Sequence, residues 1–188
     1  ESIVRGISFS EDVLATLDCL KALGAEYEIL ENSVKIKGVN PFDIKEDVSL
    51  MCRESGSTLR FFIPLALSLG RTVTLRGSER LFERPLDVYE SLCRENGFDF
   101  EKKKDSLTLC GNLQSGSFKI RGDISSQFVT GLIFALVYLG RESTIEIIPP
   151  FESRSYVDLT ISALRSFGAK VDFADEYLIK IAPSKMNS

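Results

Sequence analysis

A chain of 188 residues with 44% hydrophobic and 27% charged residues can bury a sizeable core, as one domain or a pair of small ones. Its 27 acidic and 23 basic residues are well mixed and leave a formal net charge of −4, so no basic field for a nucleic-acid partner is evident. The longest apolar run, residues 128–139, is shorter than the roughly 20 residues that a transmembrane helix needs. We therefore expect no transmembrane segment there and no membrane partner.

Four cysteines, Cys19, Cys52, Cys93 and Cys110, have no C-x-x-C spacing, and the chain contains no histidine. Neither a zinc set nor a Cys–His pair can be completed, so we expect structural thiols in a reduced, cytoplasmic protein without a metal. The one dense charge cluster, residues 101–105, is predicted to be a solvated hairpin turn rather than a binding patch.

From the N-terminus, residues 13–38 predict an amphipathic helix, a stop at Gly24, a strand, a polar turn and a second strand. Residues 55–77 predict a different pattern, in which a nearly all-apolar helix ends at Leu-Gly-Arg and is followed by a β-branched strand. A helix that is apolar around most of its circumference is buried on most sides.

Both patterns then recur. Residues 85–111 repeat the amphipathic helix with its stop at Gly97, and residues 156–181 repeat it with a stop at Gly168. Residues 125–148 repeat the apolar helix, again ending at Leu-Gly-Arg. Glycine at these stops fits the left-handed position that ends a helix.

The full unit is therefore strand, buried helix, strand, amphipathic helix, strand, strand, with a period of about 70 residues. Two units are complete, whereas the first is expected to be truncated, with a buried helix upstream of Glu1. We predict an α/β (α+β) domain with threefold pseudosymmetry, βαβαββ units and the apolar helices packed in the centre.

The loops before the two buried helices are candidate anion sites. Residues 54–60 (ESGSTLR) and 122–127 (GDISSQ) place small and hydroxyl residues where a helix N-terminus exposes unpaired N–H groups. The alternative is that Ser55, Asp123 and Ser125 are only helix caps. Because the loops occupy equivalent positions in two units, we expect them on one face, where they would bind two anionic ligands.

The junctions before the amphipathic helices add further polar groups. Arg84 precedes a proline at a predicted first helical position, so it could offer a rigid fork to a carboxylate or phosphate. The alternative is that Arg84 is solvated, or paired with Glu83 or Asp87. The Ser-Arg-Ser-Tyr stretch at 153–156 could bind a ligand, or provide a cap and a half-buried aromatic residue.

Four motifs together resemble the 5-enolpyruvylshikimate-3-phosphate synthase family: ESGSTLR (54–60), ERPL (83–86), GDISSQF (122–128) and SRSYVDLT (153–160). The resemblance covers essentially all of residues 1–188. It implies one domain of a two-domain enzyme, an inside-out α/β barrel made of three βαβαββ units. The family transfers the enolpyruvyl group of phosphoenolpyruvate to the 5-hydroxyl of shikimate 3-phosphate, through a tetrahedral ketal and with release of phosphate, in aromatic amino acid biosynthesis.

The resemblance also implies how shikimate 3-phosphate is bound. The residues that match its binding motif are Ser125, Ser126, Gln127, Ser153, Arg154 and Tyr156. Of these, the three serines match the hydroxyls that bind the phosphate, and Gln127 lies near both substrates.

For phosphoenolpyruvate, the matching residues are Gly56, Ser57, Arg84 and Gln127, with Arg60 in a supporting role. No cofactor or metal is implied. The sequence departs from one common form of the first motif, Asn-Ala-Gly-Thr, by having Glu-Ser-Gly-Ser at 54–57, which affects the shape of that pocket and its response to inhibitors.

In the family, a Lys-Ser loop precedes the point where this chain starts, and the acid and base carboxylates belong to the second domain. The resemblance therefore implies no catalytic residue in this chain, and we expect the isolated domain to be inactive. Two alternatives remain open: a UDP-N-acetylglucosamine enolpyruvyl transferase, and a non-catalytic sugar-phosphate-binding module of the same fold.

Overall fold

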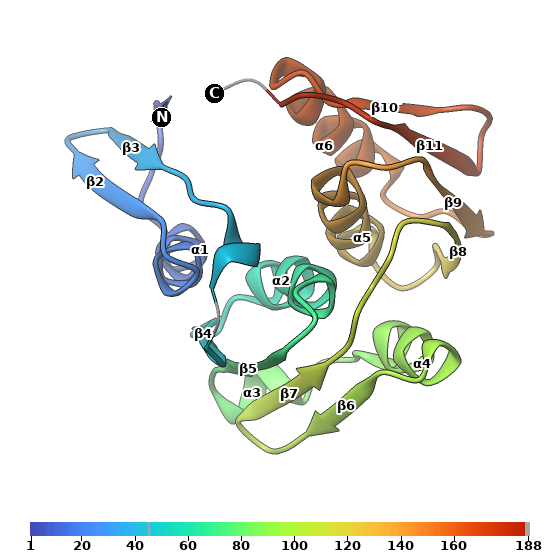
Figure 1. Cartoon of the computed structure of the whole chain (residues 1–188), viewed down its shortest axis with the longest axis horizontal. Coiled ribbons are helices and arrows are strands. Elements are labelled where there is room, and N and C mark those ends of the chain that lie inside the picture. The colour runs from blue at the N-terminus through green and yellow to red at the C-terminus, as the bar shows by residue number, and fades with distance from the viewer. Residues whose placement is uncertain (45, 187–188) are drawn as a thin grey trace.

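The computed structural model describes residues 1–44 and 46–186, and its elements follow the predicted repeat (Figure 1). The first unit contains β1 (Ser2–Arg5), α1 (Glu11–Ala22), β2 (Glu26–Leu30) and β3 (Ser33–Lys37), followed by a short 3-10 helix, η1 (Pro41–Asp43). The second contains β4 (Val48–Met51), α2 (Gly56–Ser68), β5 (Thr72–Arg76), α3 (Glu79–Phe82), α4 (Asp87–Asn96), β6 (Asp99–Lys102) and β7 (Ser106–Cys110). The third contains β8 (Ser117–Arg121), α5 (Ser126–Leu139), β9 (Ser143–Ile148), α6 (Arg154–Ser166), β10 (Lys170–Phe173) and β11 (Leu178–Ala182).

Each unit forms its own sheet, and the strand orders are equivalent. The second sheet has the order β4-β5-β7-β6 and the third the order β8-β9-β11-β10. The pairs β4/β5 and β8/β9 are parallel, and the remaining pairs are antiparallel. The first sheet, β1-β3-β2, matches the last three strands of the others. The predicted α/β class, its βαβαββ units and its threefold pseudosymmetry are confirmed.

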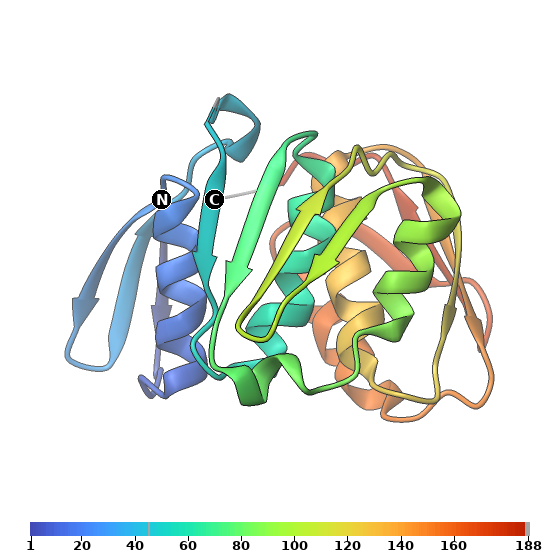
Figure 2. The ribbon, with the colours of Figure 1, turned by 90° about the horizontal axis from the view of Figure 1, so that it is seen from below.

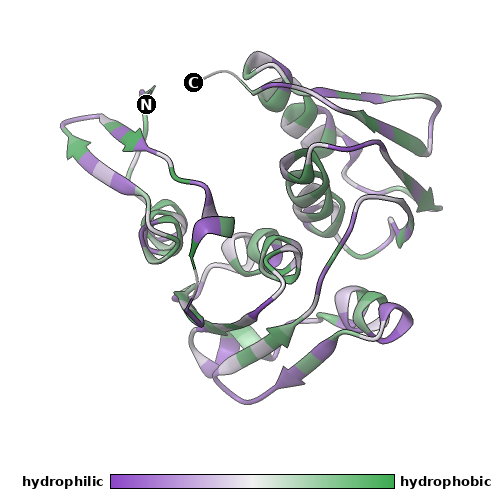
Figure 3. Ribbon diagram, in the orientation of Figure 1, coloured by the Kyte–Doolittle hydropathy of each residue, from purple (hydrophilic) through white to green (hydrophobic). Residues whose placement is uncertain are grey.

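The two apolar helices, α2 and α5, pack against each other between the sheets. Leu59, Ile63 and Leu67 of α2 are almost fully buried, as are Leu132 and Leu136 of α5. Hydropathy colouring shows α5 apolar around most of its circumference, whereas hydrophilic residues gather on the outer hairpins (Figure 3). The prediction of buried central helices is confirmed.

A glycine allows α5 to approach its neighbours closely. A Cβ added at Gly131 would collide with the Arg60 carbonyl of α2 and the Tyr89 hydroxyl of α4. The Arg60 carbonyl has no helical partner at its usual position, because Pro64 lacks an N–H. Tyr89 is fully buried and donates to the Phe128 carbonyl at 2.8 Å, so three helices meet at this point.

The glycine stops were predicted correctly. Gly24, Gly97 and Gly168 have φ values of 91°, 68° and 89°, in the left-handed region that favours glycine. Lys103 and Lys104 lie in the exposed turn between β6 and β7, as expected, and Lys102 is the last residue of β6. All four cysteines are free thiols. Within residues 1–44 and 46–186, no helix has the length and apolar character needed to cross a membrane.

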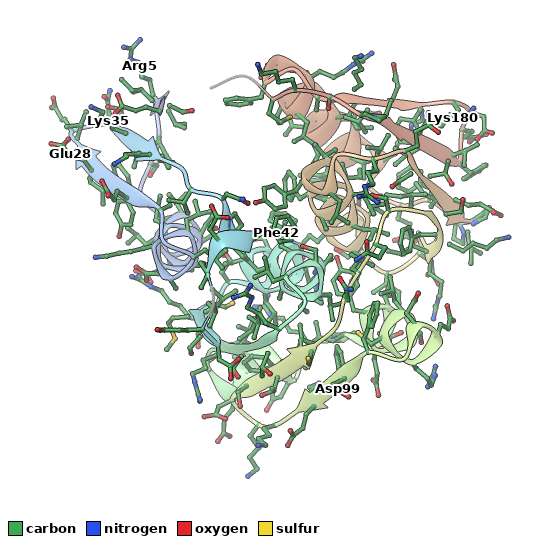
Figure 4. The ribbon with its side chains drawn as sticks, viewed as in Figure 1. Arg5, Glu28, Lys35, Phe42, Asp99 and Lys180 are labelled. Atoms are coloured by element: carbon green, nitrogen blue, oxygen red, sulfur yellow. The ribbon has the colours of Figure 1, made fainter. Side chains whose placement is uncertain are left out.

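The connection after the first unit crosses to the third. Phe42 of η1, labelled in Figure 4, stacks on Tyr138 of α5 with ring centroids 5.1 Å apart. The Tyr138 hydroxyl donates to Asn40 Oδ1 at 2.7 Å. These contacts tie the first unit to the C-terminal end of α5, opposite the end at which the helices begin.

The long helices share one direction. Figure 2 shows α1, α2, α4, α5 and α6 running side by side, with the loops that enter them at the lower edge. Their N-terminal N–H groups, which lack helical partners, therefore lie at one end of the molecule. The predicted anion loops belong to this end.

Candidate anion-binding site at the helix N-termini

The entrance to α2 combines a cap, a glycine and an arginine. Ser55 is the N-cap, and its Oγ accepts from Thr58 N at 3.1 Å and lies 3.1 Å from Ser57 Oγ. A Cβ added at Gly56 would lie 2.5 Å from Arg84 Nη1, so the guanidinium lies directly over the first residue of the helix. This places a fixed positive charge beside the free N–H groups of the helix N-terminus.

Arg84 lies in the junction before α4, and the proline after it is not where the sequence predicted. Helix α4 begins at Asp87 with Leu86 as its N-cap, so Pro85 precedes the helix instead of occupying its first position. The predicted start is wrong because the short helix α3 ends just before this junction, and Arg84 N bonds to the Leu81 carbonyl at 3.3 Å.

Carboxylates do not neutralise Arg84. In the described part of the chain no acidic side chain lies within ion-pair distance of it, including Glu83 and Asp87, the two partners considered from the sequence. Asp87 instead lies 3.7 Å from Arg121. The Arg84 guanidinium therefore keeps donors for a further acceptor.

Arg60 connects the two buried helices. Its Nη1 donates to Gln127 Oε1 at 2.7 Å and its Nη2 to the Pro85 carbonyl at 3.2 Å, while its guanidinium lies 4.9 Å from the Phe128 ring centroid. Because the amide oxygen of Gln127 accepts from Arg60, the amide NH₂ group faces away as a donor. Burial, with a smaller contribution from neighbouring Arg84, lowers the pKa of Arg60.

At the entrance to α5, Ser125 is the N-cap and its Oγ accepts from Gln127 N at 3.3 Å. This cap uses a lone pair of the oxygen and leaves the hydroxyl hydrogen available. Asp123, considered as a cap from the sequence, instead pairs with Arg121 through two bonds of 3.0 and 2.7 Å. Ser126 is the buried first residue of the helix.

The loop before α6 lies against the loop before α5, because Glu152 N donates to the Gly122 carbonyl at 3.1 Å. Ser153 occupies the N-cap position with a left-handed φ of 57°, but its side chain makes no capping bond. Tyr156 is 65% exposed. The alternative of a serine cap and a half-buried aromatic residue is therefore wrong, since neither side chain has a structural role of that kind.

Arg154 differs from Ser153 and Tyr156 because its side chain makes contacts within the protein. Its guanidinium lies 4.2 Å from the Phe173 ring centroid, and Nη1 donates to the Glu176 carbonyl at 3.3 Å. Asp158 lies 3.8 Å from Nε. These contacts turn Arg154 toward the outer hairpin of the third sheet.

The structure thus joins Gly56, Arg84, Arg60 and Gln127 through a continuous series of contacts, and it places Ser153 beside the loop that contains Ser125 and Ser126. Arginine forks, hydroxyls and an amide are groups that bind anions. Within the described ranges, no group of three histidine, cysteine or acidic side chains could hold a metal ion.

Two sets of ion pairs that lie at this end of the molecule were not predicted from the sequence. One is the Arg121–Asp123 pair, whose adjacency to the GDISSQ motif was an available signal. The other is formed by Arg53, whose partners on α1 lie 35 and 42 residues away in the chain, so no local pattern indicates them.

Known proteins resemble this chain over nearly its whole length. The family model described as EPSP synthase (3-phosphoshikimate 1-carboxyvinyltransferase) matches residues 1–188. A 3-phosphoshikimate 1-carboxyvinyltransferase of Clostridium kluyveri is 46% identical over 183 residues, and one of Clostridium novyi is 38% identical over 192 residues. Each alignment covers 95% of this chain but only 43% and 44% of the relative.

A solved structure shows the same fold. The EPSP synthase of Acinetobacter baumannii superposes with a TM-score of 0.78 at 20% sequence identity, covering 100% of this chain and 42% of that protein. The chain therefore spans less than half the length of each of these three proteins.

Proposed function

The chain belongs to the EPSP synthase (3-phosphoshikimate 1-carboxyvinyltransferase) family, and from this premise we propose that residues 1–188 form its domain for binding shikimate 3-phosphate. In the proposed reaction the 5-hydroxyl of shikimate 3-phosphate adds to phosphoenolpyruvate, and the tetrahedral ketal then eliminates inorganic phosphate. The setting is the shikimate pathway of aromatic amino acid biosynthesis, in the cytoplasm.

The single observation that carries the proposal is the position of Arg84 over Gly56, with no acidic partner among residues 1–44 and 46–186. A guanidinium held against a helix N-terminus, beside a second half-buried arginine, is an environment of uncompensated positive charge. Such a cluster is stabilised when an anion enters it, and a bidentate fork matches a carboxylate or a phosphate. We assign phosphoenolpyruvate, which carries both groups, to Gly56, Ser57 and Arg84.

The second anion is assigned to the hydroxyl groups. Ser125 and Ser126 begin α5, and Ser153 and Tyr156 belong to the adjoining loop and the first turn of α6. Neutral hydroxyls and helix N–H groups bind a phosphate through hydrogen bonds. In this proposal they hold the 3-phosphate of shikimate 3-phosphate, with Arg154 at the edge of the site and outside direct contact.

Gln127 lies between the two anions. Its amide oxygen accepts from Arg60, so its NH₂ group is the donor that remains for substrates. Arg60 is thus assigned a positioning role, since its second bond, to the Pro85 carbonyl, also holds the junction that contains Arg84. Misplacement of a binding group by about 1 Å can reduce rates by about 100-fold.

In this proposal these residues bind and orient, and none of them is a carboxylate, a histidine or a lysine, the side chains that commonly move protons in enzymes. We therefore propose that the proton-transfer groups and further cations come from a second domain of the same protein, and that domain closure completes the site. The isolated chain of 188 residues is then inactive and takes part only in binding.

The test is a titration of the ¹⁵N-labelled chain followed by amide NMR shifts. Shikimate 3-phosphate should shift the amides of residues 125–127 and 153–156, whereas UDP-N-acetylglucosamine should not. Shifts caused only by the nucleotide sugar would replace this proposal with the UDP-N-acetylglucosamine enolpyruvyl transferase. Phosphate release by the isolated chain, with both substrates present, would refute its inactivity.

A further inference from the structure

The turn that leads into α2 contains a residue in an unfavourable backbone conformation. Arg53 has a φ of 53°, in the left-handed region that side chains other than glycine rarely adopt. The turn is closed by Ser55 N, which donates to the Cys52 carbonyl at 2.9 Å. A glycine would adopt this conformation without strain, so the arginine needs another reason to be there.

The Arg53 side chain supplies that reason. Its Nε and Nη2 lie 2.9 and 2.8 Å from Asp18 Oδ2, and its Nη1 lies 2.8 Å from Glu11 Oε2. Both acids belong to α1. The side chains of Arg53 and Asp18 are only 33% and 32% exposed, so the pair is better shielded than an ordinary surface ion pair.

The backbone of the same turn is held from the opposite side. The Arg53 carbonyl accepts from Ser78 N at 3.0 Å. A Cβ added at Gly77 would lie 2.5 Å from that carbonyl oxygen, so only a glycine allows the approach. The turn is thus held between α1 and the segment that follows β5.

The residues held by this turn are those of the α2 entrance. Thr58, which is fully buried, also contacts α1, with its Oγ1 2.9 Å from Thr16 Oγ1 and 3.3 Å from the Asp12 carbonyl. The entrance to α2 is therefore attached to α1 on both sides of Gly56, through Arg53 before it and Thr58 after it. Among the described residues, the Arg53 ion pairs are the only charged contacts in this attachment.

We propose that Arg53 is a positioning residue for the anion site at the entrance to α2: its ion pairs with Glu11 and Asp18 attach the left-handed turn to α1, and this attachment keeps Gly56 and Ser57 beneath Arg84. This rests on the proposed function, in which these residues bind phosphoenolpyruvate. The 3-phosphate of shikimate 3-phosphate, bound at α5 and α6, does not depend on Arg53.

Three variants test the proposal in the full-length protein, with the second domain in place. Asp18→Asn removes the charge of the main ion-pair partner without changing any residue of the turn itself. Arg53→Gly removes the side chain and keeps the left-handed conformation accessible, so it is expected to fold. The third variant combines both changes. Asp172→Asn is the matched control, because it breaks an Arg–Asp contact between α6 and β10, in another unit.

Steady-state kinetics should show the KM for phosphoenolpyruvate rising about tenfold in both single variants, with the KM for shikimate 3-phosphate changing by less than about twofold. The double variant should have a KM for phosphoenolpyruvate no higher than that of the more impaired single variant, because the two substitutions remove the same ion pair. The control should leave both KM values unchanged.

Two results would overturn the inference while leaving the proposed function intact: unchanged KM values for phosphoenolpyruvate, or equal increases for both substrates, which indicate a general structural role. Additive effects in the double variant would also contradict a shared attachment. Absence of any turnover in the unmodified full-length protein would instead refute the proposed function itself.

Discussion

The entrances to α2 and α5 occupy equivalent positions in two units but contain different chemistry. At α2 the helix N-terminus lies beneath Arg84, with Arg60 close by, and a glycine leaves the space that the guanidinium fills. At α5 the corresponding region presents the hydroxyls of Ser125 and Ser126, and the acid of the preceding loop, Asp123, is paired with Arg121.

The difference supports the proposal that the two entrances bind two different ligands. The repeated backbone supplies the same helix N-terminus twice, while side chains from the following junction decide how much positive charge is added to it. An arginine fork favours an anion rich in carboxylate and phosphate oxygens, whereas hydroxyls suit a single phosphate on a polyhydroxylated ring. Changes at one entrance should therefore affect one ligand.

The sharpest test of this separation is Arg84→Ala. Loss of a charge-assisted fork should weaken phosphoenolpyruvate binding by about 100-fold, because hydrogen bonds to charged groups contribute about 1.5–3 kcal/mol each. The affinity for shikimate 3-phosphate should change by less than about twofold. Calorimetric titration of the full-length protein measures both, and Arg141→Ala, beyond the opposite end of α5, is the control. Equal weakening of both ligands would contradict two separate entrances.

The close packing of α2 against α5 contributes to stability, and Gly131→Ala tests this contact. Although alanine favours a helix over glycine by about 1 kcal/mol, the new methyl group would collide with the Arg60 carbonyl and the Tyr89 hydroxyl. We expect a net loss of about 2 kcal/mol in the free energy of unfolding, measured by urea denaturation. Gly116→Ala is the control, since a Cβ there meets nothing within 4 Å. An unchanged stability would show that α2 and α5 can move apart freely.

How far the sequence predicts this molecule depends on whether a feature is local. The glycine stops, the serine caps at 55 and 125 and the apolar helices depend on neighbouring residues, and the structure confirms them. The bond between Arg60 and Gln127 joins residues 67 positions apart, and neither residue indicates the other by its local pattern. The position of Pro85 was missed because a four-residue helix, α3, is too short to produce a periodic signal.

The serines of the α5 and α6 entrances permit a finer distinction. Ser125→Ala should reduce stability by about 1 kcal/mol, because it removes a helix cap, and should also weaken shikimate 3-phosphate binding about tenfold. Ser153→Ala should weaken binding similarly but leave stability unchanged, since its side chain caps nothing. Thermal unfolding combined with ligand titration measures both effects. A stability loss in Ser153→Ala would show that the serine has a structural partner after all.

The smallest expected effect concerns the ion pair beside the α5 entrance. The hydrogen bonds from Arg121 lower the pKa of the Asp123 carboxyl in the folded state. A depressed pKa means that the pair stabilises the fold above the ordinary aspartate pKa of about 4 and that this contribution disappears as the pH falls through the folded value. The melting temperature of the unmodified chain should therefore exceed that of Asp123→Asn slightly at pH 6, and the two should converge once the pH has fallen through the lowered pKa of Asp123. Because both side chains are accessible to solvent, 0.5 M salt should reduce the difference at pH 6.

A difference in melting temperature that persists at acid pH would mean that Asp123 acts through its shape or a neutral hydrogen bond. In that case the α5 entrance would hold its hydroxyls in place without any charged group, in contrast to the entrance of α2.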